Sequence, residues 1–236
     1  MTSESHSSST PAPRADPYAL PDVSGLVVGV LGGTGEQGRG LASRWAAAGQ
    51  RVIIGSRDPV RATQAAEEIG NGCQGMSNHD CAEASDVVLV AVPWQGHAAL
   101  LSDLVDVLAG KTVIDCVNPL GFDKQGAFPV PVPEGSAAQQ AAALLPDSHV
   151  VAAFHHVSAV LLLDENVAEV DADVLVLGDV RDATDRVQAL AALVPGMRGI
   201  YAGRLRNAGQ VEALTANLIS TNRRYKAHAG LRITDV

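Results

Sequence analysis

The chain has 236 residues, of which 47% are hydrophobic, 18% charged and 3% aromatic, and its formal net charge is −9. This length suits one large α/β domain, or one domain with a smaller appendage, and the apolar fraction is sufficient for a buried core. The acidic balance argues against nucleic-acid binding, which needs clustered Lys and Arg against the phosphates.

Residues 1–22 are rich in Ser and Pro and lack the apolar segment of a signal peptide, so we expect a flexible tail that is partly held near Tyr18 and Leu20. No apolar run approaches the roughly 18 residues of a membrane-spanning helix, so no membrane partner is expected. The three cysteines include no C-x-x-C pair and no zinc-like Cys/His spacing. This predicts no disulfide framework, no metal site and a reducing, cytoplasmic location.

Apolar segments alternate with amphipathic ones in the first half of the chain. We expect strands at 26–31, 52–54, 73–76, 86–92 and 112–117, and helices at 36–48, 59–69, a short stretch after 77, and 95–108. In the first helix, Leu41, Trp45 and Ala48 share the buried face, and Gly49 ends it. Continuous apolar strands alternating with helices predict an α/β fold, a Rossmann-type doubly wound parallel sheet covered on both faces.

Two helix starts carry capping signals. Asp58 precedes Pro59, which is the arrangement of an N-cap followed by the first helical residue, and Gly70 ends that helix. Ser77 and Asp80 have the spacing of a capping box. Both patterns indicate short connections from strand to helix.

The pattern changes after residue 117. Residues 118–135 are rich in Pro and Gly, which predicts a long loop over one end of the sheet, and residues 155–171 give no clear pattern. We expect Asp179 to cap the helix that begins at 180. The remaining expected elements are helices at 136–145, 180–194 and 206–229 and strands at 149–154, 173–177 and 198–202. The last helix would share one face among Val211, Leu214, Leu218 and Tyr225.

A glycine-rich loop follows the first predicted strand and opens the first helix. Gly33, Gly35 and Gly38 match the pattern G-x-G-x-x-G. Gly33 would permit the tight turn, Gly35 would let the backbone approach a pyrophosphate, and Gly38 would let the helix pack closely on the strand. The helix N-terminus then faces the anion. The loop therefore predicts dinucleotide binding; a glycine-rich turn that binds nothing would not explain all three positions.

The end of the second strand indicates which dinucleotide binds. An NAD enzyme places an acid there, roughly 20 residues after the loop, but this chain has Ser56 and Arg57. A guanidinium can pair with a 2′-phosphate through two hydrogen bonds, Arg61 lies one turn further, and Thr34 adds a hydroxyl. Asp58 could instead accept from a ribose, although its N-cap role is preferred. The pattern favours NADP.

Two further strand ends carry unusual residues. Val92 and Pro93 could press on the nicotinamide face, Trp94 could frame a large ring, and Asn118 could bind the ribose or the carboxamide. His97 could contact the cofactor or could be a partly exposed histidine at a helix start. These strand ends would meet at the carboxyl edge of the sheet.

Some catalytic patterns are missing. Neither Tyr201 nor Tyr225 has a Lys four residues later, so a Tyr-x-x-x-Lys mechanism is unsupported. No general acid–base pair for alcohol chemistry stands out. We therefore predict no catalytic residue as such, and a reaction that needs only a positioned hydride donor and acceptor.

Together these motifs resemble the family of F420-dependent NADP reductases. The resemblance runs from about residue 26 to the end and rests on LGGTGEQG (31–38), GSRDPVR (55–61), VPW (92–94), NPL (118–120), FHHVSA (154–159) and AGRLRNAGQVEALT (202–215). The chain departs from the family where His155-His156 replaces a His-Thr pair, where Arg61 stands in place of a common Lys, and where Gly96 moves the histidine to His97.

The resemblance implies reversible hydride transfer between reduced coenzyme F420, a 5-deazaflavin, and NADP, by a homo-oligomer that is often a dimer. The family's NADP contacts would fall on Thr34, Gly35, Glu36, Gln37, Ser56, Arg57, Arg61, Val92, Asn118, Ala159 and Ala229. We expect three parts in the chain: the tail at 1–22, an NADP-binding Rossmann domain at 23–154, and a smaller C-terminal α/β region at 155–236 that completes the deazaflavin site and contributes to the oligomer contact.

On the deazaflavin side we expect Ser136, His155, His156, Val157 and Asn207. Backbone N–H groups or His155 could meet charge that develops on the deazaflavin pyrimidine, while both histidines could equally be structural. Ser136 opens a helix and could bind an anionic tail or simply cap. Dry walls would come from small apolar residues, because a hydride donor and acceptor must be held about 3–3.5 Å apart.

Two other functions are consistent with the same motifs. One is an NADPH-dependent reductase of an ordinary flavin or a ferric chelate, as in relatives of the cytosolic domains of metalloreductases. The other is a non-catalytic module that senses NADP(H).

Overall fold

The computed structural model describes residue 16 and residues 18–236. Most of the predicted tail, residues 1–15 and 17, lies outside the described residues. Tyr18 is exposed, and the first buried side chain is that of Val23. In this described part of the chain, no helix combines the length and the apolar character that crossing a membrane requires.

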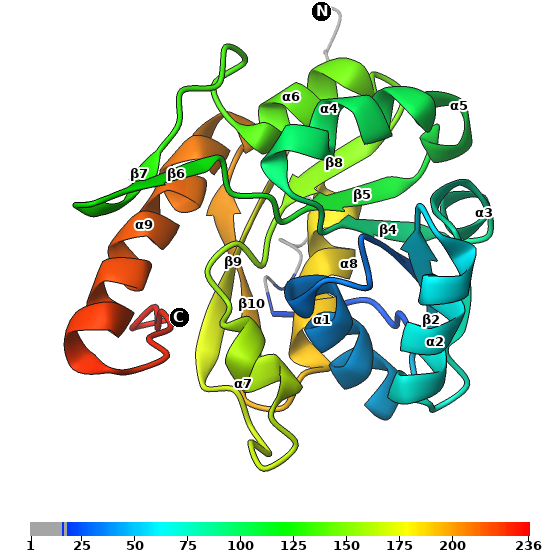
Figure 1. Cartoon of the computed structure of the whole chain (residues 1–236), viewed down its shortest axis with the longest axis horizontal. Helices are drawn as coiled ribbons and strands as arrows, with labels where there is room; N and C mark the ends of the chain where they lie inside the picture. The colour runs from blue at the N-terminus through cyan, green and yellow to red at the C-terminus, as the bar shows by residue number, and fades with distance from the viewer. Residues whose placement is uncertain (1–15, 17) are drawn as a thin grey trace, which may run out of the picture.

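The fold is built on one eight-stranded sheet with the order β10-β9-β8-β5-β4-β1-β2-β3 (Figure 1). The strands are β1 (Val27–Leu31), β2 (Arg51–Ser56), β3 (Gln74–Ser77), β4 (Val87–Val90), β5 (Thr112–Asp115), β8 (His149–Ala152), β9 (Ala172–Gly178) and β10 (Met197–Gly203). Strands β1 to β5 and β8 are parallel. The prediction of a doubly wound α/β sheet is confirmed, with one correction: β9 pairs antiparallel with β8, and β10 follows β9.

Helices cover both faces of the sheet, as the continuous apolar strands predict. They are α1 (Glu36–Ala47), α2 (Pro59–Ile69), α3 (Asn78–Glu83), α4 (Trp94–Asp103), α5 (Val105–Leu108), α6 (Ala137–Leu144), α7 (Ala159–Leu163), α8 (Arg181–Ala192), the 3₁₀ turn η1 (Leu205–Asn207) and α9 (Ala208–Tyr225). Side chains from α1, α2 and α8 share one core with Val28 and Val30, while α3 to α6 and α9 share the other with Leu31. Alternate residues of β1 thus face opposite layers.

Two helix starts and one buried face follow the sequence closely. Asp58 caps α2 by accepting from the N–H of Val60 at 3.0 Å, and Ser77 caps α3 by accepting from the N–H of Asp80 at 3.1 Å. Local hydrogen bonds therefore set the starts of α2 and α3 as predicted. On the predicted buried face of α1, Trp45 is fully buried, and its indole N–H donates to the carbonyl of Leu190 at 2.8 Å.

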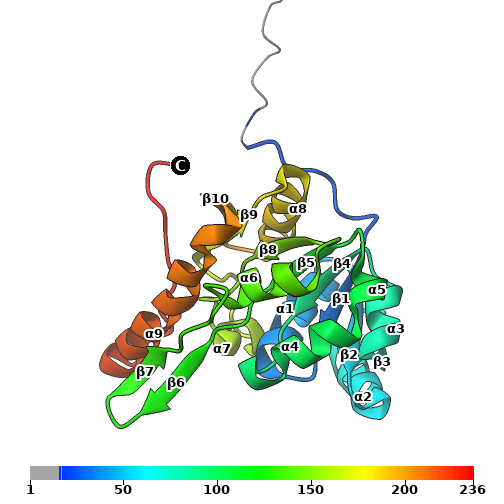
Figure 2. The same ribbon diagram turned by 90° about the horizontal axis from the view of Figure 1, so that it is seen from above.

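The predicted loop at 118–135 is wrong in part, because it contains a hairpin, β6 (Leu120–Asp123) and β7 (Gly126–Pro129). Gly126 adopts a φ of +126° at the turn, where the carboxylate of Asp123 accepts from the N–H of Gln125 at 2.7 Å. Both views show the hairpin beside α9 at one end of the molecule (Figures 1 and 2). The pairing has no strong alternating pattern, which is why the sequence did not reveal it.

Other boundaries also differ from the predictions. Ala48 is exposed because it lies past the last buried turn of α1, and the predicted helix at 95–108 divides at Leu104. Val180, not Asp179, holds the N-cap position of α8, and the Asp179 carboxylate lies 3.6 Å from Arg204 instead. Helix α9 ends at Tyr225, which is 74% exposed, because its last turns run beyond the sheet.

Candidate active site

The glycine loop connects β1 to α1 through a close approach of backbone to backbone. The left-handed residue is Gly32, with a φ of +74°, so the tight turn lies one residue before the predicted Gly33. A Cβ at Gly33 would lie 2.8 Å from the Val30 carbonyl oxygen, and one at Gly38 would lie 3.0 Å from the Cα of Gly33. Gly38 therefore has the packing role expected of it, while Gly33 packs against the strands.

Helix α1 begins without a side-chain cap. Gly35 holds the N-cap position in an extended conformation, and Glu36 is the acidic residue of the first turn. Thr34 is half-buried beside it. The N–H groups at the start of a helix have no partner within the helix, so this loop offers free donors, and pyrophosphate binding there stays a prediction.

The end of β2 carries two unpaired positive charges. Arg57 and Arg61 are exposed, and within residues 18–236 neither guanidinium forms an ion pair. Ser56 is nearly buried, and its hydroxyl accepts from the N–H of Asp58 at 3.2 Å. One oxygen of the Asp58 carboxylate caps α2, accepting from the N–H groups of Val60 and Arg61, which supports the preferred N-cap role. The charge pattern suits a phosphate.

One face of α1 holds the segment that follows β8. The side chain of Arg44 donates to four carbonyls, those of Leu161 and Leu162 at 2.8 Å, Val167 at 2.7 Å and Asp164 at 3.0 Å. We did not expect this role for Arg44, and no local pattern signals it. Charged hydrogen bonds to carbonyls are stronger than neutral ones, so Arg44 fixes α7 and the turn after it.

Gln37 makes a second link from α1. Its amide donates to the carbonyl of Phe154 at 3.2 Å, whereas the family resemblance implies a contact with NADP at this residue. Phe154 adopts a φ of +64°, which is uncommon for a residue with a side chain, and its buried ring packs edge-on against Trp45 at 5.6 Å. The backbone is thus turned sharply just before the two histidines.

His155 is buried but has no hydrogen-bond partner. Its side chain is 4% exposed, and neither ring nitrogen is bonded within the described chain. Burial lowers its pKa to about 4, against the opposing charge of Asp115, so the ring is neutral near pH 7. Buried polar groups normally find partners, so His155 is a candidate for contact with a ligand.

His156 has a structural role. Its Nε2 accepts from the N–H of Leu175 at 3.3 Å, so the ring is the Nδ1–H tautomer. Burial lowers its pKa to about 4 as well. We considered two hypotheses for the histidine pair, ligand contact and a structural role. A hydrogen bond supports the structural role at His156, and no such bond supports it at His155.

Asn118 joins three parts of the site. Its amide donates to the carbonyl of His155 at 2.8 Å, and the hydroxyl of Thr215 donates to the same carbonyl at 3.2 Å. Thr215 belongs to α9 and was not among the predicted residues, although it lies within the segment 202–215 that carries the resemblance. The end of β5, the histidine segment and α9 are therefore brought together.

His97 is fully buried, so the prediction of a partly exposed histidine is wrong. Its Nε2 lies 2.6 Å from a carboxylate oxygen of Asp115, and its Nδ1 lies 3.1 Å from the side-chain oxygen of Gln140. Burial lowers the pKa of His97, but the bond and charge of Asp115, with Gln140 and Glu212, outweigh it and raise the pKa overall. Two oxygen acceptors suit an imidazolium, which holds α4 and α6 on β5.

The start of α6 is closed by the protein's own groups. Ser136 is buried and caps α6 by accepting from the N–H of Gln139 at 3.0 Å. The Glu212 carboxylate accepts from the N–H groups of Ala137 at 2.9 Å and Ala138 at 3.1 Å, and burial raises its pKa to about 7. Because Glu212 fills this helix N-terminus, capping accounts for Ser136, and its binding of an anionic tail stays a prediction.

The apolar residues expected around the rings come from several elements. Val92 is half-buried, and a Cβ at Gly32 would lie 2.8 Å from its Cγ1, so it lies against the glycine loop. Val157 is buried. Of the remaining predicted residues, Pro93 is exposed. The others are half-buried: Trp94, Ala159, Asn207 and Ala229. No hydrogen bond within the described chain joins Asn207 or Ser136 to the histidine segment.

Comparisons with known proteins agree with this geometry. Residues 27–119 match the family model described as NADP oxidoreductase, coenzyme F420-dependent. The F420-dependent NADP reductase of Methanothermobacter marburgensis is 39% identical over 223 residues, which cover 89% of this chain and 99% of that protein. The metalloreductase STEAP3 of Rattus norvegicus is 31% identical over 192 residues, 81% of this chain but 37% of that protein.

A solved structure supports the same assignment. The crystal structure of a putative F420-dependent NADP reductase from Arthrobacter sp. FB24 superposes with a TM-score of 0.77 at 27% identity and covers 89% of this chain and 100% of that one. The glycine loop, the two free arginines and the buried histidine pair lie within the matched length. The chain therefore belongs to the family of F420-dependent NADP reductases.

Proposed function

We propose that this protein catalyses reversible hydride transfer between reduced coenzyme F420 and NADP. One edge of the sheet carries the observation that supports this proposal. An uncapped glycine-loop helix and two arginines without an ion pair in the described chain lie at the ends of β1 and β2, and the buried, neutral His155 without a hydrogen-bond partner follows β8. NADP accepts the hydride at its nicotinamide ring, and the reduced deazaflavin supplies it. Both cofactors carry the chemistry, so the protein needs to bind and orient them.

On the NADP side, residues 23–154 act as the binding domain. The loop from Gly33 to Gly38 offers backbone N–H groups to the pyrophosphate, and Arg57 and Arg61 bind the 2′-phosphate with Ser56 and Thr34. A protein of net charge −9 needs such a local positive site to hold an anionic cofactor.

On the deazaflavin side, residues 155–236 complete the site. Val92, Pro93, Val157 and Ala159 exclude water, which strengthens each remaining electrostatic interaction. The neutral His155 donates one ring N–H toward charge on the deazaflavin pyrimidine, and its carbonyl stays bound to Asn118. No side chain takes or gives a proton to an alcohol, in agreement with the absence of an acid–base pair in the sequence.

A crossed assay tests this function. NADPH or NADH is offered against oxidised deazaflavin, FMN and a ferric chelate, and loss of the deazaflavin's visible band reports turnover. We expect turnover with NADPH and deazaflavin only. The second candidate, a flavin or ferric reductase, is favoured by the similarity to STEAP3 and predicts that FMN or iron is reduced instead. Binding of NADPH without turnover of any acceptor would identify a sensor.

We also propose that the protein is a homodimer. The hairpin and the end of α9 expose large apolar side chains, with Phe122 at 69%, Phe128 at 43% and Tyr225 at 74%. A two-stranded hairpin has little stability by itself, so a second copy would stabilise this arm. Light scattering of the purified protein and of Phe122→Ser decides: a monomer in both cases contradicts the proposal.

A cytoplasmic location completes the proposal. Cys73, Cys81 and Cys116 are free thiols, and burial raises the pKa of Cys73 to about 11 and of Cys81 to about 12. Unpaired, protonated cysteines are usual in a reducing compartment. Cell fractionation with a tagged protein tests this, and recovery outside the cytoplasm would refute it.

A further inference from the structure

The residues after α9 form a segment that returns to the sheet, which we call the C-terminal strap (residues 227–236). Lys226 turns the chain with a φ of +51°, and the carbonyl of Leu231 then accepts from the N–H of Asp173 at 2.7 Å. Because β9 runs antiparallel to β8, its first residues lie at the same edge of the sheet as the carboxyl ends of the parallel strands. The strap therefore crosses the edge at which the cofactors are proposed to bind.

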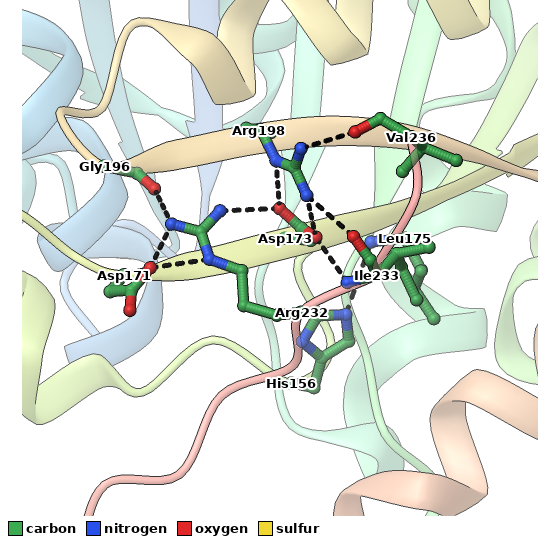
Figure 3. A network of polar contacts seen from close by, with 9 residues as sticks. All are labelled: His156, Asp171, Asp173, Leu175, Gly196, Arg198, Arg232, Ile233 and Val236. Atoms are coloured by element: carbon green, nitrogen blue, oxygen red, sulfur yellow. Dashed lines mark hydrogen bonds and ion pairs between the residues drawn. The ribbon is translucent and has the colours of Figure 1, made fainter.

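Asp173 is the centre of a clamp on this strap (Figure 3). Its carboxylate is fully buried, and one oxygen accepts from Arg198 and from Arg232, each at 2.7 Å. The other oxygen accepts from Arg198 at 2.7 Å and from the N–H of Ile233 at 2.6 Å. All lone-pair directions of the carboxylate are used, which is the condition under which a buried charge is tolerated.

The same two arginines tie the strap to both β9 and β10. Arg232, which belongs to the strap, also binds Asp171 and donates to the carbonyl of Gly196 at 3.0 Å. Arg198, which belongs to β10, donates to the strap carbonyls of Ile233 and Val236, each at 2.9 Å. The hydrogen bond from Arg198 holds the pKa of Asp173 well below its usual range, so the clamp stays charged at working pH.

The other end of the strap is held beside the start of α7. The N–H of Ala229 donates to the side chain of Asn222 at 2.6 Å, and the His228 ring lies 3.5 Å from the hydroxyl of Ser158. The short stretch between this contact and the clamp is thus fixed at both ends. Ala159 and Ala229, which the family resemblance places at NADP, flank it.

We propose that Asp173, acting with Arg198 and Arg232, is a positioning residue that fixes the C-terminal strap so that His228 and Ala229 close the nicotinamide end of the NADP site. This rests on the proposed function. A strap that is ordered before NADPH arrives does not have to be ordered during binding, so the clamp lowers the free-energy cost of binding without touching the cofactor.

Arg232→Ala tests the proposal, with Arg204→Ala as the matched control. Arg204 is an exposed arginine whose partner, Asp179, follows the opposite end of β9. We expect Arg232→Ala to raise the KM for NADPH by about tenfold, with kcat and the KM for deazaflavin within about twofold of the parent, because the strap binds ground and transition states alike. Arg232→Lys should recover part of the affinity, and the control should change none of these values.

Amide deuterium exchange gives a readout that is independent of turnover. Without ligand, amides at 227–233 should exchange faster in Arg232→Ala than in the parent protein. In the parent protein, adding NADPH should slow the exchange of the same amides. Faster exchange with an unchanged KM would leave the clamp a purely structural feature and overturn the inference. If the parent turns over no deazaflavin, the proposed function fails, while protection of the strap by NADPH still decides this inference.

Discussion

The glycine-loop side and the histidine side of the site are built in different ways. The first is local: the turn at Gly32, the start of α1 and the arginines after β2 lie within about thirty residues, and backbone N–H groups supply the binding. The second is assembled from the end of β5, the segment after β8, α9 and the strap. It is held by hydrogen bonds to carbonyls from donors that are distant in the sequence. A local site tolerates changes elsewhere, whereas an assembled one depends on each link.

Helix α1 belongs to both sides and couples them. Its first turn faces the proposed pyrophosphate, while Gln37 and Arg44 bind the carbonyls of 154–167. A Cβ at Gly40, between them, would lie 2.7 Å from the side chain of Leu162, so the helix and α7 are in close contact. The comparison therefore predicts that changes at the two ends of α1 have different consequences.

Gly33→Val should have the largest effect, on the local side. Its Cβ would lie 2.8 Å from the Val30 carbonyl oxygen and 2.9 Å from Ile54, neither of which can move freely. We expect a loss of about 3 kcal/mol or more of unfolding free energy and no measurable NADPH binding, by urea denaturation and calorimetry. Gly96→Ala is the control, because that position is open and helical, and should be neutral or slightly stabilising. Normal NADPH affinity in Gly33→Val would disprove the local account.

Arg44→Ala should destabilise the histidine side of the site, because Arg44 holds the segment after β8. Four carbonyls lose a charged donor, although water can reach some of them, so we expect a loss of about 2–3 kcal/mol in urea denaturation. The KM for deazaflavin should rise more than that for NADPH. Arg39→Ala is the control, since within residues 18–236 the ion pair of Arg39 is with the exposed Glu68 at 3.4 Å. This change should cost under about 0.5 kcal/mol of unfolding free energy. Equal losses in both variants would mean that Arg44 has no special role.

His156→Gln should change how stability depends on pH. The pKa of His156 is lowered from 6.5 to about 4, so its stabilising contribution is present above about pH 6.5 and is lost as the pH falls toward 4. Gln can still accept from Leu175 but does not titrate. Between about pH 7 and pH 4.5 the parent should lose about 2 kcal/mol more than the variant. Parallel curves in urea titrations would show that His156 does not have this pKa.

Of these changes, Arg57→Ala should have the smallest effect, and it acts on the glycine-loop side alone. We expect NADPH to bind about tenfold more weakly, or about 1.4 kcal/mol, with NADH nearly unchanged because it lacks the 2′-phosphate. Arg51→Ala, at the opposite end of β2, is the matched control and should affect neither nucleotide. Equal losses of NADPH and NADH would remove the assignment of Arg57 to the 2′-phosphate.

Features set within a few residues could be predicted from the sequence. The caps at Asp58 and Ser77, the glycine loop, and the strands and helices up to residue 117, apart from the division of the predicted helix at Leu104, all depend on hydrogen bonds or periodicity within one turn or one strand. Even there the left-handed residue is Gly32 and not Gly33, because the turn starts one residue earlier than the motif suggests.

The remaining features follow from contacts between distant segments. Glu212 caps a helix that begins 75 residues earlier, and Arg44 binds carbonyls more than 115 residues later. The buried ring of His97 is hydrogen-bonded to Asp115 and Gln140. The hairpin at 120–129 and the antiparallel β9 likewise arise from pairing partners. By itself, then, the sequence determined the dinucleotide loop and the alternation of strands and helices, because short-range bonds specify them. The histidine side and the strap were decided by the tertiary structure, because their bonds exist only once remote segments meet.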